Sequence, residues 1–87
     1  MSQMIVRHRV RDYQAWRPGF DEHERSRVAA GITNGRVFRG ADDPNDVVVI
    51  LDVADAEKAR AWTQSEDLRS VMQKVGVLGA PEIHFVE

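Results

Sequence analysis

Residues 47–53, Val-Val-Val-Ile-Leu-Asp-Val, contain the longest apolar run of the chain and limit most strongly what it can fold into. Successive side chains of a strand point to opposite faces, so a strand that is apolar at both parities is expected to be covered on both sides. A chain of 87 residues can cover one side with its own helices, but a domain of that size has little left for the other side. We therefore expect a second copy of the chain to cover the far side.

The segments around this run predict the order βαββαβ. The expected elements are a strand at residues 4–10, a helix from 12 to 30, a strand at 32–40, the strand at 47–53, a helical segment from 55 to 76 and a strand at 82–87. Asp12 and Asp55 suit helix N-caps, and Gly31 and Gly76 suit helix ends. Right-handed crossovers place both helical segments on one face of a four-stranded antiparallel sheet. The sequence thus predicts an α+β fold, a ferredoxin-like plait, in a single domain spanning residues 1–87.

Four short stretches predict local irregularities in these elements. Pro18 lies inside the first helix, where its missing backbone donor predicts a kink or a helix that restarts at this residue. Residues 33–35, Thr-Asn-Gly, predict a turn or a bulge. Thr63 and Glu66 have the spacing of a capping box, so the second helical segment is expected to restart there. Residues 79–81, Gly-Ala-Pro, predict a turn before the last strand.

The face of the sheet opposite the helices is expected to mix apolar and charged residues. If the first residue of the apolar run faces the helices, then Val48, Ile50 and Asp52 face away from them, but alternation alone does not fix this phase. Arg7 and Arg9 of the first strand share one parity and are expected on the same open face. One interpretation is a solvated face. The other is a homodimer formed through this face, with Asp52 paired to an arginine.

The first helix has one stripe of bulky side chains at intervals of three and four residues, which is the spacing of a buried helix face. The stripe contains Tyr13, Trp16, Phe20, His23, Arg27 and Ala30. It begins with aromatic rings and then presents an imidazole and a guanidinium group. A kink at Pro18 would shift the first two rings relative to the other residues.

His23 and Arg27 each allow a structural and a functional interpretation. His23 is either a histidine at the core edge, bonded to a backbone carbonyl, or a general acid or base that lines a cavity between helix and sheet. Arg27 either lays its stem along the apolar face with its head in water, or holds a carboxylate or a developing enolate oxygen in that cavity.

His8 lies at the centre of the first strand and is expected to point toward the helices, where it and His23 can converge on one cavity. The alternative is a satisfied core histidine. Trp16 and Trp62, one in each helical segment, suit a cavity for a flat aromatic ligand, although a tryptophan is more often a core residue. His84 is expected on the open face. No pair of histidines has a spacing that forces two ligands onto one face, so we expect no metal.

Composition excludes several classes of protein. The formal net charge of −2 and the lack of a basic patch argue against a nucleic-acid partner. There is no cysteine, and therefore no disulfide or thiolate site. No apolar run approaches the roughly 20 residues of a membrane span, and no signal-peptide pattern is present. We expect a soluble cytoplasmic protein.

The same residues carry a resemblance to a known family. Asp12-Tyr13, Trp16, the stretch Phe20-Asp21-Glu22-His23, Arg27 and Gly31-Ile32 resemble the first half of a small dimeric α/β-barrel family. The similarity continues through Val37-Phe38-Arg39, Asp43-Pro44-Asn45, Ser65, Leu68, Met72, Gly76-Val77 and Pro81-Glu82, and so covers almost the whole chain. This family is related to the antibiotic biosynthesis monooxygenase superfamily, some members of which are labelled cyclases.

The resemblance implies a homodimer whose sheets pack into a barrel, with a ligand cavity in each protomer. It also implies a cofactor-independent monooxygenase or cyclase that acts on a small aromatic or polyketide-like molecule, whose own anion activates oxygen in the monooxygenases. On this hypothesis His23, aided by His8, transfers protons and Arg27 stabilises an anion, while Tyr13, Trp16, Phe20 and Trp62 bind the substrate. The alternatives are a non-catalytic small-molecule-binding or stress-associated protein of the same fold, and a bare scaffold whose interior is filled by the tryptophans.

Overall fold

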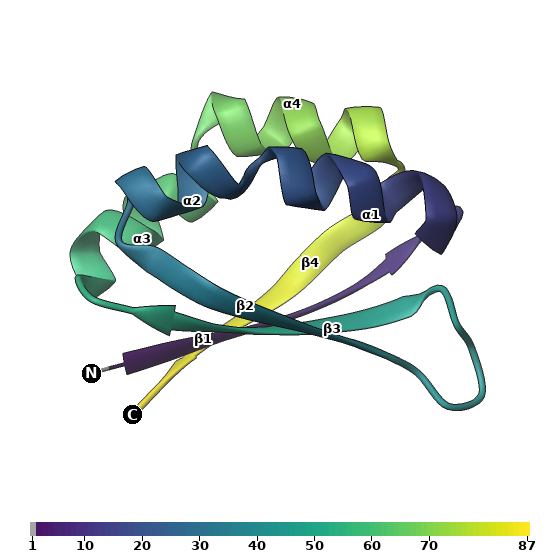
Figure 1. Cartoon of the computed structure of the whole chain (residues 1–87), viewed down its shortest axis with the longest axis horizontal. Helices are drawn as coiled ribbons and strands as arrows, with labels where there is room; N and C mark the ends of the chain where they lie inside the picture. The colour runs from purple at the N-terminus through teal and green to yellow at the C-terminus, as the bar shows by residue number, and fades with distance from the viewer. Residues whose placement is uncertain (1) are drawn as a thin grey trace.

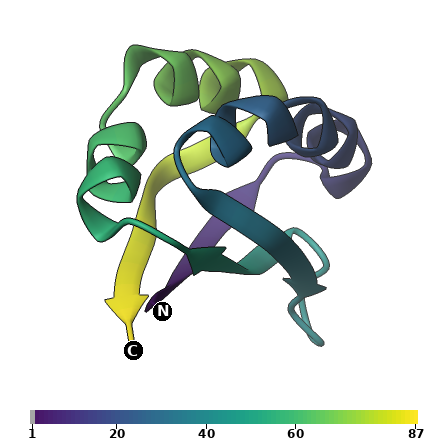
Figure 2. The same cartoon turned by 60° about the vertical axis from the view of Figure 1, so that its left-hand side comes forward.

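The computed structural model describes residues 2–87, in which a twisted sheet is covered on one face by helices (Figures 1 and 2). Met1, the first residue of the expected domain, lies outside the described part. The elements are β1 (Ser2–Val10), α1 (Tyr13–Glu22), α2 (Glu24–Ala29), β2 (Ile32–Arg39), β3 (Asp46–Val53), α3 (Ala56–Thr63), α4 (Glu66–Val75) and β4 (Val77–Val86). None of these helices, within residues 2–87, is long and apolar enough to cross a lipid bilayer.

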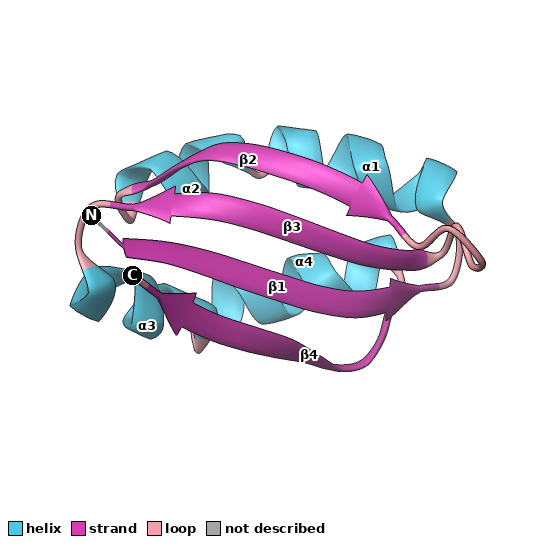
Figure 3. Ribbon diagram, turned by 90° about the horizontal axis from the view of Figure 1, so that it is seen from below, coloured by secondary structure: helices cyan, strands magenta, loops and turns pink. Residues whose placement is uncertain are grey.

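The sheet has the strand order β2-β3-β1-β4, and all neighbouring strands are antiparallel. Seen from the side away from the helices, β3 and β1 occupy the centre (Figure 3). In the register, Met4 of β1 pairs with Leu51 of β3 on one side and with Phe85 of β4 on the other. The predicted ferredoxin-like plait is therefore confirmed, with each helical segment divided in two.

The apolar run forms β3 and alternates between the two faces of the sheet. Val47, Val49, Leu51 and Val53 are fully buried beneath the helices, whereas the residues between them are half-buried on the open face. This settles the phase that alternation left undetermined. Met4, Val10, Trp16, Ile32 and Ala59 complete the buried apolar core.

The first helix breaks at a different residue from the one predicted. α1 continues through Pro18, and the break falls at His23, which ends α1 and precedes α2. Position 19 has no room for a side chain, since a Cβ atom there would lie 2.1 Å from Cγ1 of Val75. Gly19 therefore marks the close approach of α1 to α4.

The second helical segment restarts as predicted, but with another cap. Asp55 caps α3 by accepting hydrogen bonds from the amides of Glu57 (3.0 Å) and Lys58 (3.2 Å). α4 is capped by Ser65, whose hydroxyl accepts from the amide of Leu68, and not by Thr63, whose hydroxyl donates to a carbonyl within α3. Thr63 still belongs to α3, so its side chain cannot reach the start of α4.

Two bulges replace regular pairing in the outer strands. The β2–β3 register shifts between Thr33 and Arg36, where Asn34 has a φ of 55°, in agreement with the predicted turn or bulge. The turn predicted at residues 79–81 is wrong, because β4 begins directly after Gly76 and these residues form an irregularity within the strand. Gly79, with a φ of 71°, provides the left-handed conformation that lets the strand continue.

The open face carries intrachain ion pairs between apolar positions. Arg7 pairs with Asp46 at 3.0 Å, and Asp52 accepts a hydrogen bond from Arg36, also at 3.0 Å. Arg9 also forms an ion pair, with Asp43. The arginine partner expected for Asp52 is therefore present within the chain itself. These pairs are largely exposed and contribute little to stability individually.

Candidate functional site

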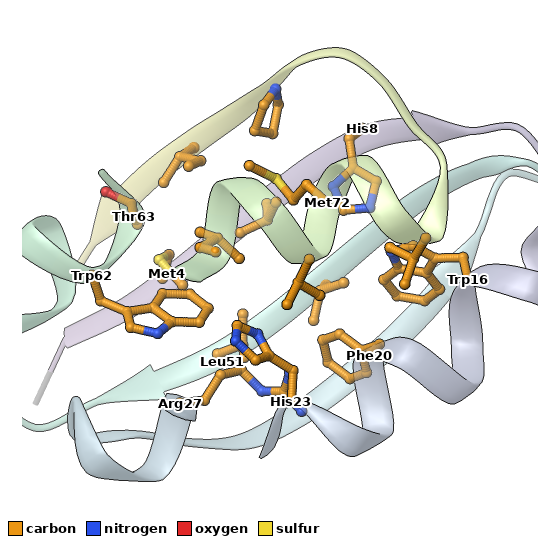
Figure 4. Close-up of a pocket in the computed structure, with 17 residues that line it drawn as sticks. Met4, His8, Trp16, Phe20, His23, Arg27, Leu51, Trp62, Thr63 and Met72 are labelled. Carbon is orange, nitrogen blue, oxygen red and sulfur yellow. The ribbon is translucent and has the colours of Figure 1, made fainter. Parts of the chain in front are cut away.

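The helices and the sheet enclose a cavity of about 70 Å³ that opens to the surface (Figure 4). Side chains from β1, β3 and β4 line its lower side, and side chains from all the helices of residues 2–87 line the remainder. Most of these side chains are apolar. The polar groups among them come from His8, His23, Arg27, Trp62 and Thr63.

One side of the cavity is formed by α4, through four apolar residues that we call the roof: Leu68, Val71, Met72 and Val75. They follow the helical spacing seen in the sequence. None of the α4 residues is fully buried, so the roof lies between the cavity and solvent.

Aromatic rings form a continuous wall between two polar side chains. The rings of Trp16 and Phe20 are stacked, with their centroids 4.9 Å apart and their planes inclined by 26°. The imidazole of His8 meets Trp16 edge-on at 5.5 Å. At the other end, the guanidinium carbon of Arg27 lies 3.8 Å from the centroid of Phe20. The wall thus runs from His8 over two rings to Arg27.

Arg27 is a buried cation without a counterion. It is only 6% exposed, and its side chain has no ion-pair partner among residues 2–87. Burial lowers the pKa of Arg27, because the charged form loses its water, while Glu24 and Asp21 act in the opposite direction at a distance. A guanidinium nevertheless keeps its charge at neutral pH. A buried cation that lines a cavity is suited to hold an anionic group.

His23 is oriented by a network that joins α2 to α3 and α4. Its Nε2 lies 2.8 Å from Oδ2 of Asp67, which also accepts a hydrogen bond from the Ser26 hydroxyl at 2.7 Å. The indole nitrogen of Trp62 donates in turn to Ser26 at 2.8 Å. Hydrogen bonding by Ser26 and then by His23 lowers the pKa of Asp67, so this residue is a carboxylate at neutral pH. The carboxylate accepts from Nε2–H, and Nδ1 remains as the nitrogen that can take up a proton.

His8 is buried without any hydrogen-bond partner. The residue is 9% exposed, and neither ring nitrogen has a partner in the part of the chain that the structure describes. Burial lowers the pKa of His8, with Asp46 opposing the shift. The ring is therefore neutral at pH 7, with one nitrogen able to donate and the other able to accept.

The structure brings most of the candidate residues selected from the sequence to this one cavity. His8, Trp16, Phe20, His23, Arg27 and Trp62 all line it. Tyr13 does not. As the first residue of α1 it lies beyond the end of the cavity, where its hydroxyl accepts from Arg17 at 3.2 Å and its ring lies 3.9 Å beneath the guanidinium of Arg39.

Asp67 and Ser26 were missed by the reasoning from sequence. Asp67 occupies the first turn of α4, where an acidic residue is explained by the helix dipole alone. Only the tertiary contact distinguishes it from its neighbour Glu66. His84 is exposed and pairs with Ile5 across the sheet, which places it on the open face. Residues 2–87 contain no cluster of three or more histidine, aspartate or glutamate side chains arranged to hold a metal ion.

Comparisons with solved structures establish the fold. No family model matches the sequence, and no curated protein is detectably similar to it. A candidate antibiotic biosynthesis monooxygenase from Bordetella bronchiseptica is similar with a TM-score of 0.80 and 16% identity, over 99% of this chain and 94% of that one. A second candidate monooxygenase, from Nitrosomonas europaea, has a TM-score of 0.70 and 17% identity, over 100% and 97% of the two chains. SnoaB, a cofactor-independent oxygenase from Streptomyces nogalater, has a TM-score of 0.75 and 13% identity, over 99% and 90%.

The chain therefore has the fold of the antibiotic biosynthesis monooxygenase structures over its whole described length, as the resemblance predicts. Identities of this size extend to the fold alone. Activity has to be argued from the residues in the cavity.

Proposed function

We propose that this protein is a cofactor-independent enzyme that removes a proton from a small aromatic or polyketide-like molecule and binds the oxygen anion that results. The observation that carries this proposal is the buried, unpaired guanidinium of Arg27 in the same cavity as the carboxylate-oriented imidazole of His23 (Figure 4). A cation and an oriented base serve one reaction type well, namely the removal of a proton to form a delocalised anion.

In this mechanism Nδ1 of His23 takes a proton from a hydroxyl or an acidic ring carbon of the substrate. Asp67 keeps the imidazole in the tautomer with Nε2–H and stabilises the imidazolium that forms. Arg27 stabilises the negative oxygen of the resulting phenolate or enolate. When a substrate fills the cavity between the apolar wall and the roof, it displaces water, which strengthens both charge interactions.

The anion formed in this way has an electron-rich carbon that can react further. Reaction of this carbon with molecular oxygen gives a peroxide anion that takes the proton back from His23. Loss of water from the hydroperoxide, with the hydrogen remaining on that carbon, then leaves a carbonyl group that keeps one oxygen atom, which is a monooxygenase reaction. Attack on a carbonyl of the same molecule instead forms a carbon–carbon bond, and the resulting alkoxide takes the proton back from His23, which is a cyclase reaction. The monooxygenase reading is supported by the structural similarity to SnoaB, which is described as a cofactor-independent oxygenase. The expectation of a cytoplasmic protein stays a prediction.

Ring binding requires the cavity to enlarge. Its volume of about 70 Å³ is roughly half of the ~150 Å³ of an engineered protein cavity that binds benzene. The roof is the side that can give way, because α4 has no fully buried residue and Met72 has a flexible, unbranched side chain. We expect α4 to move outward while the substrate enters and to close again over it, and the bound substrate to keep Met72 displaced, which provides the additional volume.

Turnover by a His23→Ala variant tests the proposal. Purified protein is incubated with a panel of hydroxylated aromatic compounds in air, and loss of substrate and consumption of oxygen are followed together. We expect the wild type to convert at least one compound, and the variant to bind it without converting it while keeping the wild-type circular dichroism spectrum. Unchanged turnover would reject His23 as the base. Binding without conversion by the wild type would favour the non-catalytic binding protein.

We also propose that two copies of the chain pair through the open face of the sheet. Phe38, Leu78 and Val86 expose large apolar side chains on that face, and Ile5 and Ile50 lie opposite each other in its centre. The described helices all lie on the other side (Figure 3). Homodimer interfaces are more apolar than the rest of a protein surface, and charges that are already paired within the chain leave no unpaired charge to bury in such a contact.

A further inference from the structure

His8 has a place in the cavity that the proton-transfer mechanism does not use. It lies on the inner face of β1, where Arg7 pairs with Glu82 and Arg9 with Leu78, so that His8 faces the irregular stretch of β4 at residues 79–81. No backbone or side-chain group within residues 2–87 satisfies either ring nitrogen. Nearly all buried polar groups in native proteins are paired, so a pair of unpaired nitrogens in a cavity wall points to a missing partner.

The neighbours of His8 do not account for a histidine at this position. Apart from Ser2 at the start of the strand, the other residues on the inner face of β1 are apolar, namely Met4, Val6 and Val10. An aliphatic side chain would pack against Trp16 equally well and would leave no polar atom unsatisfied. The hydrogen-bonding capacity of His8 is therefore not used by any group of residues 2–87. What it offers is a neutral ring that can both donate and accept a hydrogen bond.

His8 and Arg27 lie at the two ends of the aromatic wall. The contacts run in order from His8 to Trp16 at 5.5 Å, from Trp16 to Phe20 at 4.9 Å and from Phe20 to Arg27 at 3.8 Å. The stacked rings of Trp16 and Phe20 thus separate the neutral imidazole of His8 from the guanidinium group of Arg27. Figure 4 shows His8 and Arg27 on opposite sides of the lining, with Trp16 nearer to His8 and Phe20 nearer to Arg27.

We infer that the ligand has two oxygen functions, an ionised oxygen held by Arg27 and a neutral hydroxyl or carbonyl held by His8, at opposite ends of a flat aromatic body that lies along Trp16 and Phe20. His8 is then the residue that selects ligands by the group farthest from the anion. This inference rests on the proposed function, because it takes Arg27 as the anion site. It adds the placement of the ligand along the aromatic wall and the chemistry of its second group.

Two naphthoates that differ in one group test this inference. The probes are 2-naphthoate and 6-hydroxy-2-naphthoate, which share the carboxylate and the ring system and differ only in the distal hydroxyl. Binding to wild type, His8→Leu and Arg27→Met is measured by isothermal titration calorimetry. We expect the wild type to prefer the hydroxylated probe by about tenfold, which is the effect of one good hydrogen bond to a group otherwise left unpaired. In His8→Leu the two probes are expected to bind equally, with the affinity for 2-naphthoate retained.

The possible failures are distinguishable. If both probes bind the wild type equally, or if the preference survives in His8→Leu, the inference about His8 is wrong while the Arg27 site stands. If neither probe binds the wild type, or if Arg27→Met binds both as well as the wild type does, the anion site fails and the inference fails with it.

Thermal unfolding of the unliganded proteins gives a second measurement. Because no group of residues 2–87 hydrogen-bonds to His8, His8→Leu is expected to melt at the wild-type temperature or above it. A lower melting temperature, or a variant that does not fold, would show that His8 has a structural role and would overturn the inference. In the wild type, the ring ¹⁵N signals of His8, assigned by their loss in His8→Leu, are expected to move with the hydroxylated probe and not with 2-naphthoate.

Discussion

His23 depends for its orientation on a carboxylate that comes from a distant part of the chain. Asp67 lies 44 residues further along, in α4, and its contact with His23 at 2.8 Å is reinforced by Ser26. A histidine whose tautomer is fixed in this way presents one defined nitrogen for proton transfer. On the proposed mechanism, loss of this orienting contact is expected to lower the rate even though the imidazole remains.

Replacing Asp67 by asparagine is therefore expected to reduce turnover without unfolding the protein. The amide leaves the tautomer of His23 unfixed and removes the charge that stabilises the imidazolium. We expect a loss in kcat of about 10²-fold or more, with KM little changed. Glu66→Gln is the matched control, because Glu66 is the adjacent acidic residue in the same helical turn and makes only an exposed contact with Arg69. Equal losses in both variants would contradict a specific role for Asp67.

The same carboxylate makes a pH-dependent contribution to stability. Its hydrogen bonds with Ser26 and His23 lower the pKa of Asp67 in the folded state. A carboxyl group of this kind stabilises the fold above its unfolded pKa of about 3.9, and the contribution is lost as the pH falls through the folded value. We expect the melting temperature of the wild type to exceed that of Asp67→Asn by a constant amount near pH 7, and the difference to shrink below about pH 4. Melting curves between pH 7 and pH 2.5 measure this, and a difference that grows with acidity would contradict it.

At the scale of the elements, the close approach of α1 to α4 holds the roof over the cavity. Gly19 is the contact point, because a Cβ there would meet Cγ1 of Val75 at 2.1 Å. Such a distance cannot be accommodated unless the side chain of Val75 or one of the two helices moves. Gly19 therefore allows α4 to lie close to α1 beside the cavity.

Gly19→Ala is expected to destabilise the protein although alanine favours helices. Overpacking at a helix contact costs about 1–3 kcal/mol, which outweighs the gain of up to about 1 kcal/mol in helix propensity. Val75→Ala removes the clashing methyl groups, so the double variant Gly19→Ala/Val75→Ala should be more stable than the sum of the two single changes predicts. Urea unfolding of the four proteins measures this coupling. Simple additivity would show that the two helices do not meet at Gly19.

The helical period explains which site residues the sequence could reveal. Trp16, Phe20, His23 and Arg27 share one face of a helical stripe, and that face covers the sheet as expected. The same period wrongly included Tyr13, because periodicity does not say where along a helix the cavity ends. The helical period gave no information on Asp67, because its contact with His23 forms only when α4 packs beside α2. Contacts between helices that are distant in the chain lie outside what spacing can predict.

At the scale of the whole molecule, the alternation of β3 and the order of the elements were sufficient to predict the plait. The errors occurred where a local signal competed with tertiary contacts. Gly79 and Pro81 suggested a turn, but pairing with β1 carries the strand through them as a bulge. Pro18 suggested a break, but packing against the sheet and α4 keeps α1 continuous across it. The cavity was expected from the pattern of aromatic residues, whereas its small volume depends on side-chain packing and was not.

The proposed dimer predicts that the protein behaves as a pair of chains in solution. Phe38, on the open face, and Val28, on α2, are both 52% exposed and form a matched pair of apolar surface positions. We expect Phe38→Lys to convert the dimer into a folded monomer, because it places a charge in the contact, and Val28→Lys to leave the dimer intact. Native mass spectrometry measures the assembly directly. A wild-type protein that is monomeric at micromolar concentration would contradict the pairing.

The location of Asp67 on α4 has a consequence for the timing of the proposed reaction. Asp67 is carried by α4, whereas its partners His23 and Ser26 belong to the opposite helical pair. If α4 moves outward to admit a substrate, as we expect, the carboxylate moves with it and no longer orients the imidazole. His23 then regains its orientation only when α4 closes over the bound substrate. On the proposed mechanism, the anion is therefore formed only in the closed cavity, where bulk solvent cannot protonate it.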